Sequence, residues 1–420
     1  MPVRSAARAR SAASPAILTT GLAGFATRLY RGEDVSGPHR ALLERIEQNP
    51  DDSSALMDLS VLLQLCGRKE NALACQARAL EVQRCYHLPA GSSLPAQIRL
   101  LMFAVAGDFM ANTPVEFLID GMPVSLHTLF LDADGALPAE IPPHDIALVG
   151  IAESAETLPL LLRLAPRLEA WPKPVLNRPV RILDLARERL YEVLGETPGL
   201  HVPPTVRTNR ATLAALAERE LALAQLLPRA TYPVIVRPAG SHAGNGLEKI
   251  DDAGALATYL GLQAGDLFYL SPFVDYAGAD GQFRKYRVVC ISGRPYLAHM
   301  AVARHWMLHY LNAGMHEDAG KRAEEARELN EFEHRFGARH GEALRRMAAT
   351  LDLEYFAIDC AETRDGRLLV FEAGTAMIVH RMDPPDVFPY KQAPMTRICE
   401  AFVEMLAHRI CEAAITSNMG

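Results

Sequence analysis

The chain of 420 residues has no cysteine framework. Its seven cysteines are scattered, without a CxxC pair or the spacing of a zinc finger, so we expect them to be reduced packing residues. Charged residues make up 22% and hydrophobic residues 49%, close to the average for globular proteins, which excludes a disordered or collagen-like chain. We therefore expect a folded protein of several domains.

Two further features are missing. The longest apolar runs, at 59–65 and 146–151, are far shorter than the ~20 residues that cross a bilayer, so no membrane span is predicted. Lys and Arg number 43 against 50 Asp and Glu, a net charge of −7, without the basic excess that nucleic-acid binding requires. Neither a membrane nor a nucleic acid is an expected partner.

The N-terminal segment has some features of a targeting peptide, because Arg4, Arg8 and Arg10 precede a weakly apolar stretch. The stretch is interrupted by Ser, Thr, Pro and Gly and lacks a solid apolar centre, which favours a flexible tail over residues 1–37. We expect a cytoplasmic protein.

The segment 38–94 has apolar residues at helical spacing. It predicts a helix at 52–66, a turn at Gly67 and a second helix at 68–83. One such pair cannot bury its apolar face alone, so it is either an appendage that fills a groove or a docking element for a protein partner or a second copy of the chain. This hairpin resembles a single tetratricopeptide repeat, at whose offsets stand Leu56, Leu59, Ser60, Leu63, Ala72 and Ala79.

The rest of the chain divides into residues 95–180 and residues 181–420. The first part alternates strand-like runs with a helix and predicts an α/β domain with a parallel sheet. Its expected elements are strands at 100–106, 115–119, 126–131 and 146–150 and a helix at 156–170. The second part begins with helices at 181–194 and 211–227 and then changes to paired strands.

A glycine-rich turn follows the short strand 233–237 and leads into a second strand at 247–250. Glycines let backbone N–H groups approach phosphate oxygens, and Arg237 at the base of the turn supplies positive charge. The turn carries Gly240, Ser241, His242, Gly244 and Gly246. Taken alone, such a hairpin is an ordinary turn as readily as a lid over a ligand.

Strands at 354–361 and 367–373 are joined at Asp365-Gly366, a strong hairpin signal. A two-residue turn places Asp359 directly opposite Glu372 on one face. Two opposed carboxylates destabilise a sheet unless a cation lies between them, and Mg²⁺ prefers such oxygen ligands. The alternative is that either acid pairs with an arginine.

Two strands are expected between the glycine turn and this hairpin. The run 266–275 is either a strand whose edge presents backbone groups to an adenine ring or a plain core strand. The run 284–291 places Lys285 and Arg287 on one face, which suits phosphate or carboxylate groups. The charged segment 316–337 predicts a solvated helix.

In this order, the arginine-tipped strand, glycine turn, hinge strand, basic strand and acidic hairpin resemble the ATP-grasp superfamily, over about residues 100 to 407. The resemblance implies an α+β fold in which two α+β subdomains clamp ATP, preceded here by a small α/β pre-ATP-grasp domain and the helical hairpin. It further implies ATP and Mg²⁺ as cofactors and a ligase that phosphorylates a carboxylate for attack by an amine. The substrates implied are a small molecule or a peptide.

By this resemblance, Arg187 and Arg237 take the places of the two lysines that touch the nucleotide phosphates, and the adenine hinge runs from Tyr269 to Val274. The cofactor-binding residues so implied are Arg187, Arg237, Gly240, Ser241, His242, Gly244, Gly246, Tyr269, Phe273, Val274, Lys285 and Arg287. Asp359 and Glu372 match the metal ligands. The asparagine of the family's Glu-x-Asn strand is replaced by Gly374, so a second metal would need Thr375, a water or a substrate oxygen.

The block 303–312 follows the basic strand, where the superfamily places residues that face substrate and γ-phosphate. The resemblance makes Arg304, His309 and Asn312 the catalytic candidates; the alternative is a packed helix whose histidines bond to backbone. Because the asparagine is missing, an ATP-binding scaffold or sensor without turnover stays open beside the ligase, as does a phosphotransferase.

Overall fold

The computed structural model describes residues 15–91, 95–241 and 244–419, which form two compact units. Unit 1 contains the chain up to Ile151, Pro166–Leu176 and the chain from Leu406 onwards. Unit 2 contains Ala152–Ala165 and Asn177–Met405. The predicted boundary after residue 94 therefore does not separate units, because the helical hairpin and the α/β segment fold together.

Unit 1 is built on a six-stranded sheet in the order β1-β2-β4-β3-β5-β6. All neighbours pair in parallel except β2 and β4, which confirms the predicted parallel sheet. The strands are β1 (Ala16–Ile17), β2 (Cys85–Leu88), β3 (Ile98–Val105), β4 (Val124–Leu131), β5 (Ile146–Val149) and β6 (Val175–Leu176). The strand predicted at 115–119 is wrong, since Glu116–Ile119 is the short helix α5. A run of four apolar residues does not distinguish the two.

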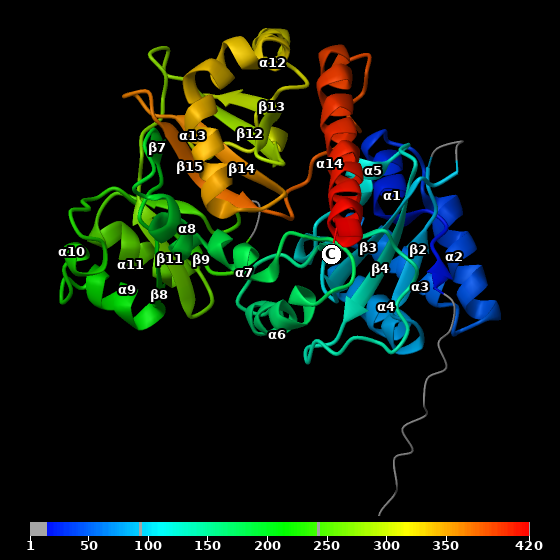
Figure 1. Ribbon diagram of the computed structural model, residues 1–420. Helices are drawn as coiled ribbons and strands as arrows, with labels where there is room; N and C mark the ends of the chain where they lie inside the picture. The colour runs from blue at the N-terminus through cyan, green and yellow to red at the C-terminus, as the bar shows by residue number, and fades with distance from the viewer. Residues whose placement is uncertain (1–14, 92–94, 242–243, 420) are drawn as a thin grey trace, which may run out of the picture. The chain divides into compact units, whose positions relative to one another are not determined.

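Four helices belong to the N-terminal part of unit 1 (Figure 1): α1 (Gly21–Tyr30), α2 (Ser36–Gln48), α3 (Ser53–Leu65) and α4 (Lys69–Val82). Helices α3 and α4 confirm the predicted hairpin, and Gly67 makes the turn with φ of +73°. Their apolar side chains are covered by Phe25 of α1 and Tyr86 of β2, which are each 1% exposed. The hairpin is therefore an integral part of unit 1.

The predicted flexible tail needs correction for the same reason. Residues 16 and 17 form β1 against β2, and α1 buries Phe25 in the core. The run that suggested a tail contains enough apolar residues to pack into the core. Its small residues let α1 lie close to its neighbours. Residues 1–14 lie outside the described part of the chain.

Unit 2 contains two sheets, which confirms the predicted α+β class. The four-stranded sheet has the order β10-β9-β11-β8 and the five-stranded sheet the order β13-β12-β14-β15-β7. The first comprises β8 (Val206–Asn209), β9 (Val234–Pro238), β10 (Glu248–Ile250) and β11 (Leu267–Pro272). The second comprises β7 (Leu200–His201), β12 (Phe283–Ile291), β13 (Arg294–Ala303), β14 (Tyr355–Glu362) and β15 (Leu368–Gly374).

The helices of unit 2 are α7 (Pro179–Ile182), α8 (Arg187–Leu194), α9 (Arg210–Ala217), α10 (Leu223–Leu226), α11 (Ala253–Leu262), α12 (Ala319–Asn330) and α13 (Phe336–Leu351). The helices α6 (Leu158–Glu169) and α14 (Gln392–Met419) contribute residues to both units. The two long helices predicted at 181–194 and 211–227 are each interrupted. The second is divided into α9 and α10, and Arg219 between them has a φ of +65°. Helices α9 and α11 share a core with one face of the four-stranded sheet, around Leu213, Val236 and Phe268.

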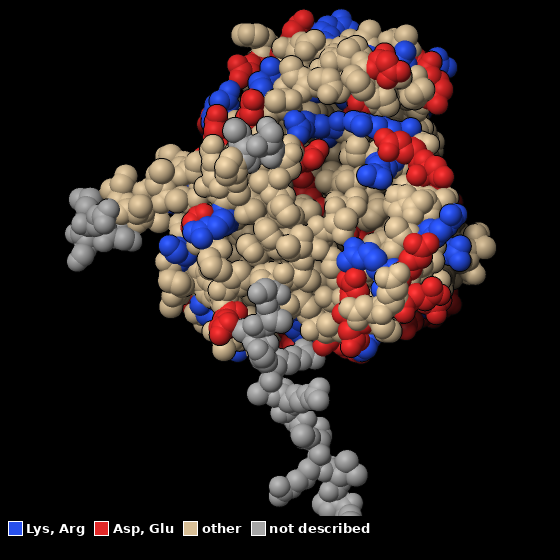
Figure 2. Space-filling view, turned by 90° about the vertical axis from the view of Figure 1, so that its right-hand side faces the viewer, with Lys and Arg blue, Asp and Glu red and all other residues tan. Residues whose placement is uncertain are grey.

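No helix in the described part of the chain is long and apolar enough to cross a membrane. The face drawn in Figure 2 carries acidic and basic side chains interspersed among uncharged ones.

Candidate functional site

The β14–β15 hairpin places Asp359 directly opposite Glu372, as predicted. The turn itself is different, because Gly366 donates to Thr363 and the loop holds three residues instead of two. That change alone would shift the pairing by one residue. An irregularity in β15 between the partners of Asp359 and Cys360 restores it, so the predicted pair is right although the predicted turn is wrong.

Asp359 is 3% exposed and is held by the two cations of the basic strand β12. Lys285 Nζ lies 2.7 Å from its Oδ2, and Arg287 Nε lies 2.8 Å from its Oδ1. Burial alone would raise the pKa of Asp359, but Arg287 and Lys285 hold it well below its usual range. Asp359 therefore pairs with an arginine, which was the alternative to a metal site in the sequence analysis.

Glu372 is paired with Arg187, which begins α8. Burial would raise the pKa of Glu372, and Asp359 acts in the same direction. Arg187, Lys285 and Arg237 outweigh both and lower it. Both acids are therefore ionised at neutral pH.

The glycine turn packs onto its own arginine. Arg237 in β9 donates to the side-chain and backbone oxygens of Ser241, and Ser241 Oγ donates to Pro238 at 2.8 Å. Burial and the neighbouring Arg187 lower the pKa of Arg237 to about 10, so it stays charged. Gly240 has a φ of +73°, a backbone conformation that glycine adopts more readily than other residues. His242 lies outside the described residues.

His309 lies against this turn. A Cβ atom on Gly244 would come within 2.5 Å of His309 Nε2, and the φ of +73° also favours glycine there. That nitrogen is buried and has no hydrogen-bond partner among the described residues. Burial and the cations Lys285 and Arg237 lower the pKa of His309, which keeps the ring uncharged at neutral pH.

The open face of the four-stranded sheet continues the site. Tyr269 in β11 pairs with Arg237 on one side and with Arg207 of β8 on the other, so the three side chains share one face. This face is opposite the α9 and α11 core. Phe273 follows β11, and Lys249 Nζ of β10 lies 4.9 Å from the centre of its ring.

Three of the predicted residues stand apart from this cluster. Val274 packs in an apolar group around Tyr276 and Phe371. Asn312 is exposed and accepts from the backbone N–H of His309 at 2.9 Å, which shapes the local turn. Arg304 is exposed, and within the described ranges no hydrogen bond or ion pair connects it to the cluster.

Sequence reasoning missed four charged residues here. Arg207 and Lys249 lie in strands of four and three residues, which are too short for alternation to reveal a face. Glu153 and Glu188 act on each other and on Tyr269: burial and Glu188 raise the pKa of Glu153 to about 7. The chain between them contains the helices α6 and α7 and the strand β6, so their proximity had no local signal.

Magnesium is implied by the resemblance. Nowhere in the described part of the chain are three His, Cys, Asp or Glu side chains grouped to hold a metal. Asp359 and Glu372 supply hard oxygen donors on one face, and the buried hydroxyl of Thr375 has no partner among the described residues. Because Lys285, Arg287 and Arg187 hold these carboxylates, the donor set would fit a magnesium ion only where those ion pairs open.

No protein-family model and no curated protein matches the chain. Its structure is similar to D-alanine–D-alanine ligase of Bacillus anthracis complexed with ATP, with 12% identity, a TM-score of 0.45, and 75% of this chain and 99% of that chain covered. A RimK domain protein of Sphaerobacter thermophilus has 18% identity and a TM-score of 0.40, with 73% and 99% covered. The ligase PsnB, complexed with a precursor peptide and AMPPNP, has 12% identity and a TM-score of 0.39, with 75% and 99% covered.

The second and third of these are ATP-grasp proteins. The likeness concerns the fold alone, and membership of the ATP-grasp superfamily stays what the sequence motifs predict. The single tetratricopeptide repeat stays a prediction.

Proposed function

We propose that the chain binds ATP at the cluster described above and uses it to join a carboxylate to an amine. The observation that carries the proposal is the gathering of four cations around two carboxylates beside a glycine turn. The cations are Arg187, Arg237, Lys285 and Arg287, and the carboxylates are Asp359 and Glu372. The excess of positive charge suits an anionic polyphosphate, which guanidinium and ammonium groups bind well.

Each part of the cluster has a place in this chemistry. Backbone amides of the glycine turn and Arg237 would hold the phosphates, and the face that carries Tyr269 and Phe273 would receive the base. Asp359 and Glu372 would hold magnesium, which neutralises charge on the γ-phosphoryl group as it transfers. The carboxylate would form an acyl phosphate, and amine attack would then release phosphate. His309, beside the turn, would contact the substrate or γ-phosphate.

The decisive measurement is calorimetric titration of the full chain with ATP and magnesium. We expect Arg237→Ala to weaken binding by about tenfold or more, the worth of one charge-assisted hydrogen bond to phosphate. Arg327→Ala on the exposed face of α12 is the matched control. Equal effects of the two substitutions would contradict the site.

A second function is favoured by one observation: both oxygens of Asp359 are already held by cations, and Gly374 stands where asparagine is expected. The chain would then bind ATP as a scaffold or sensor without turnover. ADP release that requires both an added acid and an amine supports the ligase. ATP binding with no product from a broad substrate panel supports the scaffold, and a stable phosphorylated product supports a phosphotransferase.

A further inference from the structure

The two cations that hold Asp359 do so in different ways. Arg287 donates from Nε to Oδ1 at 2.8 Å and from Nη2 to Oδ2 at 3.1 Å. Its remaining nitrogen, Nη1, donates to the carbonyl oxygen of Ile378 at 3.1 Å. Because all three nitrogens of its planar guanidinium group are bonded, Arg287 is fixed in place.

Lys285 is the less firmly held of the two. Its Nζ lies 2.7 Å from Oδ2 of Asp359, and in the described part of the chain it makes no other ion pair. The side chain of Lys285 is 15% exposed and that of Asp359 only 4%, so the ammonium group is the more accessible member of the pair. An ammonium group on a flexible four-carbon stem can exchange one anionic oxygen for another with little change in the backbone.

The charge of the cluster determines which ligand can cause this exchange. Four cations and two carboxylates leave a net charge of +2. A divalent cation on its own would raise the charge to +4 and would have to displace a lysine from a buried acid. A triphosphate, with about four negative charges, would instead lower the charge and offer Lys285 new oxygen partners. The cluster therefore favours the nucleotide before the metal.

We propose that Lys285 is a gate on the metal site. In the free protein its ammonium group occupies Oδ2 of Asp359, and it releases this oxygen only when a bound triphosphate provides a phosphate oxygen in its place. Arg187 has the same part at Glu372, with which it is paired. The gate makes binding of a divalent cation depend on the nucleotide, and it rests on the proposed function, which supplies the triphosphate.

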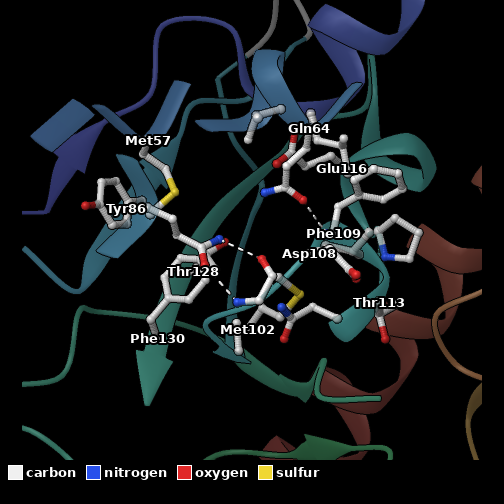
Figure 3. Close-up of a pocket in the computed structure, with 18 of the residues that line it drawn as sticks. Met57, Gln64, Tyr86, Met102, Asp108, Phe109, Thr113, Glu116, Thr128 and Phe130 are labelled. Atoms are coloured by element: carbon white, nitrogen blue, oxygen red, sulfur yellow. Dashed lines mark hydrogen bonds between the residues drawn. The ribbon is translucent and has the colours of Figure 1, made fainter. Parts of the chain in front are cut away.

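A lysine–aspartate pair in unit 1 provides a matched control. Lys69 Nζ lies 2.8 Å from Asp108 Oδ2, and Asp108 lines a cavity of about 90 Å³ beside α3 and α4 (Figure 3). Gln64 and Gln76 accept from backbone N–H groups of the segment after β3, at 2.8 Å and 2.7 Å, which fixes the segment that carries Asp108. Lys69→Met therefore frees an aspartate of similar geometry that lies outside the ATP cluster.

The probe is MnCl₂, titrated into the full chain without nucleotide, with free Mn²⁺ followed by electron paramagnetic resonance. Mn²⁺ takes the same hard oxygen ligands as Mg²⁺. Lys285→Met keeps the apolar stem and removes the charge, and we expect it to bind Mn²⁺ at least about tenfold more tightly than the parent does. Lys69→Met should bind Mn²⁺ as the parent does.

Arg237→Met separates a gate from a general effect of charge. Arg237 belongs to the same cluster but bonds to Ser241 and not to either acid. Its removal should therefore raise Mn²⁺ affinity less than Lys285→Met does. Equal gains in these two variants would overturn the proposal, as would a Lys285→Met protein that binds Mn²⁺ no better than the parent. If Lys285→Met does not fold, Arg187→Met frees Glu372 and should show the same gain.

The nucleotide half of the gate is tested by calorimetry with ATP in excess EDTA. The parent should bind ATP without metal, and Lys285→Met should bind it about tenfold more weakly, because one phosphate contact is lost. The Mn²⁺ titrations contain no nucleotide, so the two failures differ. Intact ATP binding without the expected Mn²⁺ gain overturns the gate alone. The Mn²⁺ gain without any ATP binding overturns the proposed function and, with it, the triphosphate as the opening ligand.

Discussion

Glu116 of α5, which accepts from the backbone N–H of Ala23 in α1, gives unit 1 a stability that falls as pH rises. Its folded pKa of about 7 lies above the ordinary 4.5, so the folded state prefers the protonated form. The free energy of unfolding should therefore be highest near pH 5 and decrease as Glu116 ionises toward pH 8. A shift of this size corresponds to about 3 kcal/mol.

The perturbation is Glu116→Gln, which keeps a hydrogen-bond acceptor for the N–H of Ala23. We expect the variant to match the parent near pH 5 and to exceed it by up to about 3 kcal/mol at pH 8. Asp58, His87 and His127 also titrate differently on folding, but both proteins contain them, so the difference isolates Glu116.

The assay is urea denaturation at pH 5 and pH 8, followed by tryptophan fluorescence. The chain has two tryptophans, Trp171 in unit 1 and Trp306 in unit 2, so a Trp306→Phe background makes the signal report unit 1. Glu47→Gln, at an exposed position in α2, is the control and should follow the parent at both pH values. If Glu116→Gln shows the same pH dependence as the parent, the pKa of Glu116 is not raised on folding and the reasoning is refuted.

Two further substitutions test buried polar groups of unit 2, each by chemical denaturation. Asn177→Ala removes the amide that bonds both the N–H and the carbonyl of Tyr355, and we expect a loss of about 2 to 4 kcal/mol. Lys391→Met leaves Glu325 and Asp383 without their buried cation and should cost about 3 to 5 kcal/mol. Adding Glu325→Gln should recover part of the second loss; full additivity would argue against the ion pair.

The parts of the site that follow local rules could be predicted from the sequence. Alternation within a strand put Lys285 and Arg287 on one face, and pairing across a hairpin put Asp359 opposite Glu372. The second success depended on an irregularity in β15 that no sequence rule indicated. The position of the acids was predictable, and the turn geometry was not.

Long-range burial was the part that could not be predicted. The charged segment 316–337 reads as a solvated helix, yet Glu325 of α12 is 0% exposed. It is buried because Lys391, Tyr310 and Tyr390 reach it from distant parts of the chain. Periodicity describes which residues share a helix face but not which face meets a cation 66 residues later in the sequence.

The two amides that clamp the segment after β3 determine how far this protein can be shortened. Gln64 and Gln76 come from the N-terminal hairpin, but the backbone groups that they satisfy belong to the segment that follows β3 of the α/β sheet. A fragment that starts at residue 95, where the sequence pattern changes, would expose these N–H groups and the apolar underside of the sheet to water. A stable piece of unit 1 therefore includes the N-terminal hairpin.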